Sequence, residues 1–204
     1  MVDVEKMLAY NNPNAKQYRQ LAERQGRSGE SRLDHPYVYG WDRLIRNDKS
    51  QGAETLRKDL RNLLSGKVLI DLGCNTAVAM GLIAKELGAS AYIGVDLHYQ
   101  ALQPGRKGET YEPMEFHFHS GDMLEFVSRL TPDNINFSIN GIDGNVLGVN
   151  AEEYSKALSI ELKRATLSGS AILVCCSYVE NYLPEAGFRC ITRQGRCEAL
   201  YMRG

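Results

Sequence analysis

Residues 67–77 read Lys-Val-Leu-Ile-Asp-Leu-Gly-Cys-Asn-Thr-Ala, an apolar run followed by an aspartate, a glycine and small residues. The continuous apolar residues 68–70 predict a strand that is covered on both faces, and therefore a central parallel strand. Gly73 permits a tight turn in which the backbone can approach a ligand closely. A helix is predicted from Thr76 to Gly88, and the free N–H groups of its first turn suit a carboxylate or phosphate.

Strands and helices alternate on both sides of this stretch. The expected strands cover residues 67–73, 91–96, 114–119, 135–143 and 171–176, followed by a hairpin of 187–191 and 197–202. The expected helices cover residues 15–25, 53–66, 76–88 and 150–169, the last with a capping box of Asn150 and Glu153. Residues 114–119 alternate between apolar and polar side chains, which predicts an edge strand. The pattern indicates an α/β protein with a mostly parallel sheet of seven strands and an antiparallel C-terminal hairpin.

Three aspartates follow the early strands at even spacing. Asp96 comes 25 residues after Asp71, and Asp122 comes a further 26 residues on. Open α/β sheets bind ligands at the carboxyl ends of their strands, where a carboxylate can accept hydrogen bonds from two ribose hydroxyls. Each aspartate alone is equally typical of a tight turn or a helix N-cap. Their order along the chain favours a shared binding site.

Composition narrows the function classes. The 204 residues include 24 Lys and Arg against 25 Asp and Glu, and this net charge of −1 argues against a protein that coats nucleic acid. Basic residues outnumber acidic residues only in residues 1–67, and this local excess keeps RNA open as a partner. The five cysteines form no CxxC pair, so we expect reduced thiols and no metal site. The chain shows neither a signal peptide nor a membrane-spanning run, which predicts a cytoplasmic protein without membrane contact.

The motifs resemble those of the class I S-adenosylmethionine-dependent methyltransferases. VLIDLGCNTA (68–77) is similar to their first motif and YIGVDLH (92–98) to their second. FHFHSGDMLEF (116–126) is similar to the third motif and NFSINGIDGNVL (136–147) to the fourth. The resemblance covers about residues 53–204, so we expect a Rossmann-like methyltransferase domain at 51–204 behind an N-terminal helical cap at 1–50.

The resemblance implies S-adenosylmethionine as cofactor and assigns each motif a part of it. The first motif would bind the methionine end of the cofactor through Asp71, Gly73, Cys74, Asn75, Thr76 and Ala77. Asp96 with Leu97 would bind the ribose hydroxyls, and Asp122 with Met123 would bind the adenine. Asp143 is expected near the transferring methyl group, where it is the candidate catalytic residue. An equal alternative for Asp143 is a carboxylate that caps the following loop.

The function expected from this resemblance is methyl transfer to an acceptor, which we expect to be a small molecule. Of three alternative functions, two stay open and one is disfavoured. Ala77 stands where family members often carry glycine, which keeps a catalytically silent binding module open. An RNA methyltransferase is a further alternative. A nicotinamide-dependent oxidoreductase is disfavoured because the chain lacks a G-x-G-x-x-G turn for the pyrophosphate.

Overall fold

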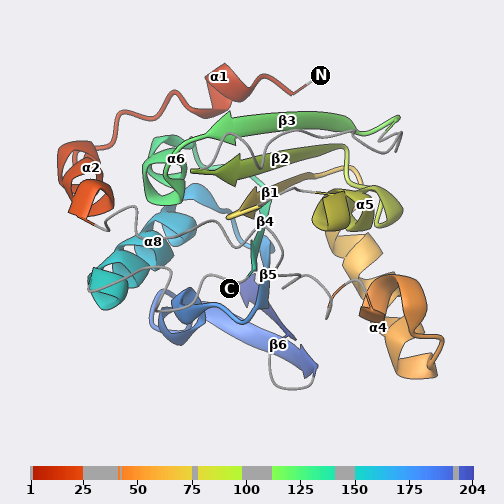
Figure 1. Cartoon of the computed structure of the whole chain (residues 1–204). Coiled ribbons are helices and arrows are strands. Elements are labelled where there is room, and N and C mark those ends of the chain that lie inside the picture. Colours follow the sequence, from red (N-terminus) through yellow and green to blue (C-terminus); the bar gives the residue numbers. More distant parts are fainter. Residues whose placement is uncertain are drawn as a thin grey trace.

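The computed structural model describes residues 2–24, 41, 43–74, 78–97, 112–140, 150–194 and 198–204. The strands are β1 (Val68–Leu72), β2 (Ala91–Asp96), β3 (Glu115–Ser120), β4 (Asn136–Asn140), β5 (Ala171–Cys175), β6 (Phe188–Gln194) and β7 (Glu198–Arg203). They form one sheet in the order β3-β2-β1-β4-β5-β7-β6 (Figure 1). The first five strands run parallel, and β7 is antiparallel to both β5 and β6. The predicted α/β fold with a closing antiparallel hairpin is confirmed.

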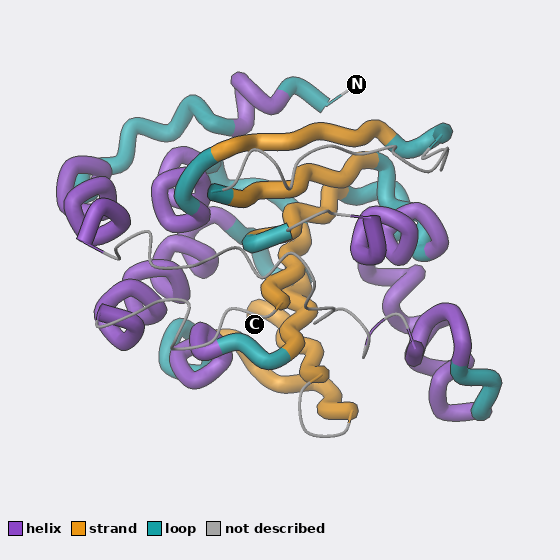
Figure 2. Tube along the Cα trace, in the orientation of Figure 1, coloured by secondary structure: helices purple, strands orange, loops and turns teal. Residues whose placement is uncertain are grey.

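Helices cover both faces of the sheet (Figures 1 and 2). Helices α2 (Ala15–Arg24), α6 (Met123–Arg129) and α8 (Ala151–Ala165) lie on one face, and α4 (Gln51–Leu64) and α5 (Val78–Glu86) lie on the other. Shorter helical segments are α1 (Val4–Met7), η1 (Arg43–Asn47) and η4 (Tyr178–Tyr182). Each face has its own apolar core, one built around α6 and α8 and the other around α4 and α5. This three-layer arrangement leaves the carboxyl edge of the parallel strands as the place for a site.

The elements form for the reasons that the sequence pattern indicated. Helix α4 begins after Ser50, whose side chain accepts a hydrogen bond from the Ala53 amide, and it buries Leu56, Leu60 and Leu64 on one face. The strands β4 and β5 are buried throughout, whereas β3 is only half-buried along its length. This difference fits the place of β3 at an edge of the sheet, as predicted.

Two local predictions differ from the structure. Asn150 takes the N-cap position of α8, but its side chain makes no capping hydrogen bond, so the predicted capping box with Glu153 is absent. Helix α8 ends at Ala165, and Gly169 adopts a positive φ of 84° in the turn before β5 instead of closing the helix. Strand β4 is described to Asn140, and residues 141–143 of the predicted strand lie outside the described residues.

The N-terminal segment packs into the domain along residues 2–24. Leu8, Tyr18 and Leu21 are buried in the same core as α6 and α8. The Asn12 side-chain amide donates to the Ser128 carbonyl and to the Glu161 carboxylate, both at 3.0 Å. These contacts tie the first part of the expected cap to the sheet domain. The boundary at residue 50 stays a prediction, since much of residues 25–42 lies outside the described ranges.

Candidate functional site

The turn after β1 is tied to β2 by its backbone. Gly73 has a positive φ of 72°, which the glycine adopts without steric cost. The amides of Gly73 and Cys74 both donate to the Val95 carbonyl, at 2.8 and 3.1 Å. Asn75, Thr76 and Ala77, the rest of the predicted methionine-binding turn, lie outside the described residues.

A glycine in β2 makes room for this turn. A Cβ at Gly94 would lie 2.8 Å from the Cys74 sulfur and 3.2 Å from two ring carbons of Phe118. Cys74 itself is buried, and burial raises the pKa of its thiol well above the usual range. The Cys74 side chain therefore packs as a small apolar group against β2.

Asp71 lies inside the sheet with its carboxylate satisfied by neighbours. The Tyr92 hydroxyl donates to one carboxylate oxygen at 2.6 Å, and the Asn140 side-chain amide donates to the other at 3.4 Å. Burial raises the pKa of Asp71 to about 7, although hydrogen bonds from Tyr92, Ser138 and Asn140 act in the opposite direction. Through these hydrogen bonds Asp71 connects the carboxyl ends of β1, β2 and β4.

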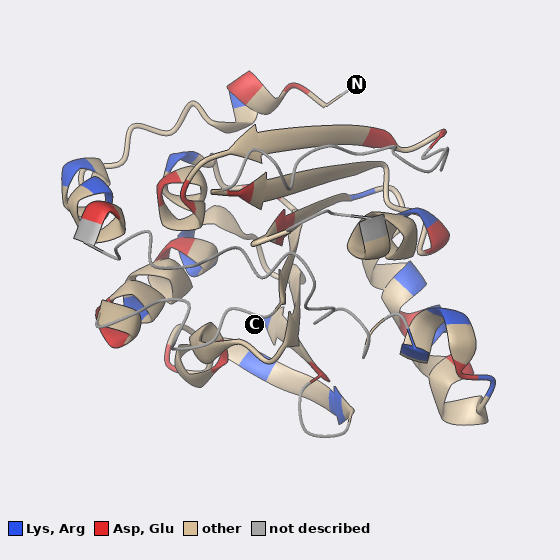
Figure 3. Ribbon diagram, in the orientation of Figure 1, with Lys and Arg blue, Asp and Glu red and all other residues tan. Residues whose placement is uncertain are grey.

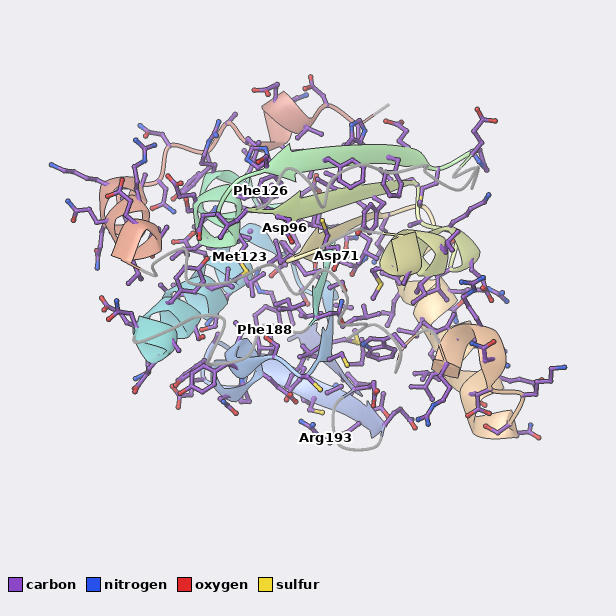
Figure 4. All side chains as sticks on the ribbon, viewed as in Figure 1. Asp71, Asp96, Met123, Phe126, Phe188 and Arg193 are labelled. Atoms are coloured by element: carbon purple, nitrogen blue, oxygen red, sulfur yellow. The ribbon has the colours of Figure 1, made fainter. Side chains whose placement is uncertain are left out.

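Asp96 ends β2 on the same edge of the sheet. Asp71 is opposite Gly94 in the parallel register, so Asp96 extends two residues beyond that pair. The Asp96 carbonyl accepts a hydrogen bond from the Gly121 amide at 2.9 Å, which fixes the strand end against the loop before α6. Asp96 is half-buried and the following Leu97 is 59% exposed. Figure 4 shows Asp71, Asp96 and Met123 together in the upper centre of the view.

Asp122 caps α6. One of its carboxylate oxygens accepts from the Leu124 and Glu125 amides at 2.8 and 3.0 Å. The other oxygen accepts from the buried Tyr154 hydroxyl at 2.8 Å. Burial raises the pKa of Asp122, and these hydrogen bonds oppose that rise. The helix N-cap role that was open for this aspartate is present, and it leaves Met123, the half-buried first residue of α6, beside the strand ends.

Two further polar residues lie at the ends of β4 and β5; the sequence pattern had indicated Ser177 as a residue that borders the acceptor site or ends the strand, whereas Asn140 was missed. Asn140 ends β4 and Ser177 follows β5, and each is only 7% exposed. The Asn140 side-chain oxygen and the Ser177 hydroxyl are buried, and neither has a hydrogen-bond partner among the described residues. An unpaired buried polar group costs about 1–3 kcal/mol, so such atoms are uncommon in native proteins. The available signal was a polar residue at the end of each apolar run.

The structure gives less support to the other candidate site residues, Asp143 and the histidines. Asp143, the predicted catalytic residue, lies outside the described residues. The His119 ring meets the Phe126 ring at an angle of 54° with centroids 4.8 Å apart, and the His117 ring nitrogen lies 3.3 Å from the Glu115 carboxylate. In the described ranges, no group of three or more His, Cys, Asp or Glu side chains is arranged to hold a metal ion. Within the same ranges, no helix is long and apolar enough to cross a membrane. Acidic and basic residues both occur on α2, α4 and α8 (Figure 3).

Comparison with known proteins agrees with the motifs. No protein-family model matches the chain. Ribosomal protein L11 methyltransferase from Erwinia tasmaniensis is 28% identical over 124 residues, which are 57% of this chain and 40% of that protein. The match therefore spans less than half the length of this curated relative.

Two solved structures share the fold. The yhhF protein from Escherichia coli, a methyltransferase by name, is 19% identical with a TM-score of 0.54, over 76% of this chain and 87% of that chain. Monomeric WbdD is 18% identical with a TM-score of 0.55, over 83% of this chain and 44% of that chain. The cofactor that these relatives imply is S-adenosylmethionine, as the motifs predicted. In the order of its motifs and in its fold, the chain is similar to the class I S-adenosylmethionine-dependent methyltransferases, as the sequence predicted.

Proposed function

We propose that the chain is an S-adenosylmethionine-dependent methyltransferase whose acceptor is a protein. The observation that most supports the use of this cofactor is that the Gly73 turn and Asp96 lie at the same edge of the sheet, on the neighbouring strands β1 and β2. The positive φ at Gly73 and the half-buried carboxylate after β2 fit a nucleoside with an amino-acid tail. Gly73, Asp96, Leu97 and Met123 are the described residues that would hold the cofactor.

S-adenosylmethionine, when bound, supplies a methyl group on a positively charged sulfur, which leaves as a neutral thioether. The chain's own contribution is to orient the acceptor, to exclude water and to hold the strand ends in place. Asp71 and Asp122 contribute to the last of these through their hydrogen bonds to Tyr92, Asn140 and the α6 amides. Asp143 stays a proposed orienting residue or base.

A protein acceptor is preferred because the curated relative is named for a ribosomal protein. No comparison supports the small-molecule acceptor expected from the sequence, and we do not retain it. The near-zero net charge gives an RNA acceptor no additional support. The cytoplasmic location also stays a prediction.

The test is methyl transfer from tritium-labelled S-adenosylmethionine to purified ribosomal protein L11, with ribosomal RNA as a parallel acceptor. Incorporation into the protein supports the proposal, and incorporation into RNA alone would replace the acceptor class. Cofactor binding without transfer to either acceptor would favour the silent binding module. No binding of S-adenosylmethionine at all would end the proposal.

A further inference from the structure

The basic excess in the first third of the chain comes from one segment. Residues 1–42 carry six Lys or Arg and six Asp or Glu, whereas residues 43–67 carry seven Lys or Arg against three Asp or Glu. The remaining residues, 68–204, carry 11 Lys or Arg against 16 Asp or Glu. The near-zero net charge therefore hides a basic segment and an acidic remainder. Such a division makes residues 43–67 the part of the chain that suits an anionic partner.

The structure gathers these charges on one surface. The segment forms η1, the helix α4 and the short connection between them. Five of its Lys and Arg side chains are exposed, and together they are called the basic face: Arg43, Arg46, Lys49, Lys58 and Arg61. Figure 3 shows the blue positions on η1 and α4 at the lower right of the view.

Hydrogen bonds hold η1 and α4 in a fixed relation. The Arg57 guanidinium of α4 donates to the Asp48 backbone carbonyl at 2.5 Å. Arg46 of η1 and Arg61 of α4 both contact Glu86, the last residue of α5. The Arg46 guanidinium lies 4.0 Å from the Glu86 carboxylate, and the Arg61 Nε donates to the Glu86 backbone carbonyl at 3.3 Å. The surface is therefore formed before a partner binds, which lowers the entropy lost on binding.

Acidic neighbours neutralise little of this charge. In the part of the chain that the structure describes, Arg43, Lys49 and Lys58 form no ion pair. The Asp48 carboxylate is turned to the backbone, where it accepts from the Ser50 amide at 2.8 Å. Three exposed cations of the basic face are thus available to an anion.

The chemistry of the basic face favours phosphate groups over a protein or a membrane. The large apolar side chains that are exposed in the described ranges are Leu97, Ile160, Leu167 and Ile191, and none of them belongs to η1 or α4. Protein interfaces need an apolar or aromatic centre, and a helix on a membrane surface needs an apolar face. Phosphate groups, in contrast, are bound by Arg and Lys side chains without apolar contacts.

The shape of the basic face favours duplex RNA over other nucleic acids. Single strands are bound by bases that stack on aromatic side chains, but Trp41, next to η1, is fully buried. Readers of duplex DNA place a helix in the deep major groove. Helix α4 packs along one side through Leu56, Leu60 and Leu64 and is held to η1 on another, so it does not project from the domain. Duplex RNA presents a wide, shallow minor groove bordered by phosphates, which a flat basic surface can contact.

We propose that the basic face binds the phosphate backbone of double-stranded RNA. This site is separate from the cofactor site, because α4 leads into the amino end of β1, whereas the Gly73 turn follows its carboxyl end (Figure 1). The RNA is accordingly a docking partner and not the methyl acceptor. The inference does not depend on the proposed function.

The test is fluorescence anisotropy with a labelled RNA duplex of about 20 base pairs, without cofactor, at several salt concentrations. The unlabelled competitors are the same duplex, a DNA duplex and a single-stranded RNA of equal length, polyglutamate, and phosphatidylglycerol vesicles. Binding in the micromolar range is expected at low salt, with duplex RNA as the strongest competitor. If each of the five cations neutralises one phosphate, log K should fall against log salt with a slope of about −4.5.

Variants locate the binding. Arg43→Gln/Lys49→Gln/Lys58→Gln removes three exposed charges that form no ion pair among the described residues, so the fold should persist, as circular dichroism can verify. Its affinity for the RNA duplex should fall at least about tenfold, and the slope should drop to about −2.

A matched control removes the same charge elsewhere. Lys16→Gln/Lys163→Gln/Arg189→Gln takes three exposed charges from α2, α8 and β6. It should leave the affinity within about twofold, because exposed charges farther away than a Debye length are largely screened.

Four results would overturn the inference. They are no binding of duplex RNA by the parent protein, equal weakening in the two triple variants, stronger competition by polyglutamate or vesicles than by duplex RNA, and equal competition by the DNA duplex. Because the cofactor is left out, a failure to bind S-adenosylmethionine or to transfer methyl groups would count against the proposed function alone.

Discussion

Gly94→Ala tests how closely the turn after β1 packs against β2. The added Cβ would lie 2.8 Å from the Cys74 sulfur, closer than real Cβ contacts, and 3.2 Å from the Phe118 ring. Gly94 is fully buried between β1 and β3, so the strain cannot be relieved toward solvent. Overpacking of this kind costs about 2 kcal/mol, which corresponds to a Tm lower by roughly 6 °C in a domain of this size.

The second variant identifies the clash. Cys74→Ala alone removes a buried sulfur and should cost about 1 kcal/mol. In Gly94→Ala/Cys74→Ala the 2.8 Å contact is gone, so the double variant should lose no more than about 2 kcal/mol, less than the sum of the single changes. The free energy of unfolding is measured by urea denaturation for all three proteins.

Gly52→Ala on α4 is the matched control, because a Cβ there meets nothing within 4 Å and alanine favours the helix. It should leave stability unchanged or raise it slightly. Strictly additive losses, or a Gly94→Ala protein as stable as the parent, would refute the packing argument.

Three further predictions concern buried polar groups. The pKa of Asp71 is raised to about 7 in the folded protein, above its unfolded value, so the folded state binds more protons and stability falls as pH rises from about 4 to 7; Asp71→Asn should flatten this fall in urea denaturation at pH 5, 6 and 7. Asp122→Ala removes the cap of α6 and takes the acceptor from the Tyr154 O–H group, whose oxygen still accepts from the Leu124 amide; this should cost about 2–3 kcal/mol by the same assay, whereas an unchanged midpoint would contradict the capping role. Asn12→Ala breaks the buried contact with Glu161 and should cost about 1–2 kcal/mol in thermal unfolding; unchanged stability would contradict a stabilising role for this contact.

The fold could be predicted because its signals are local. The apolar runs at 68–70 and 171–176 became the buried strands β1 and β5, and the alternation at 114–119 became the edge strand β3. These patterns depend on which face of a strand meets the core, and the sequence records that directly. The integration of residues 2–24 was missed because Asn12 and Glu161 are 149 residues apart. No local pattern reports such a contact.

The places of Asp71 and Asp122 at the strand ends were predictable from the sequence, but the contacts of their side chains were not. Asp71 and Asp122 lie at strand ends as expected, but their carboxylates are engaged by Tyr92, Tyr154 and backbone amides. An aspartate before a helix reads the same in sequence whether it caps the helix or binds a ligand. Asn140 was missed because no sequence pattern reports that its nitrogen is engaged by Asp71 while its side-chain oxygen has no hydrogen-bond partner among the described residues. The assignments of Asp96, Leu97 and Met123 to the cofactor stay predictions.

The most direct measurement is a calorimetric titration of S-adenosylmethionine, S-adenosylhomocysteine and NAD into the parent protein, Asp96→Ala and the control Asp59→Ala, whose aspartate is exposed on α4. The parent and the control should bind the first two compounds with equal affinity and not bind NAD. Asp96→Ala should lose that binding while its circular dichroism spectrum stays unchanged, because the carboxylate is expected to face ribose hydroxyls instead of the core. Undiminished affinity in Asp96→Ala, or binding of NAD by the parent, would contradict the account of this site.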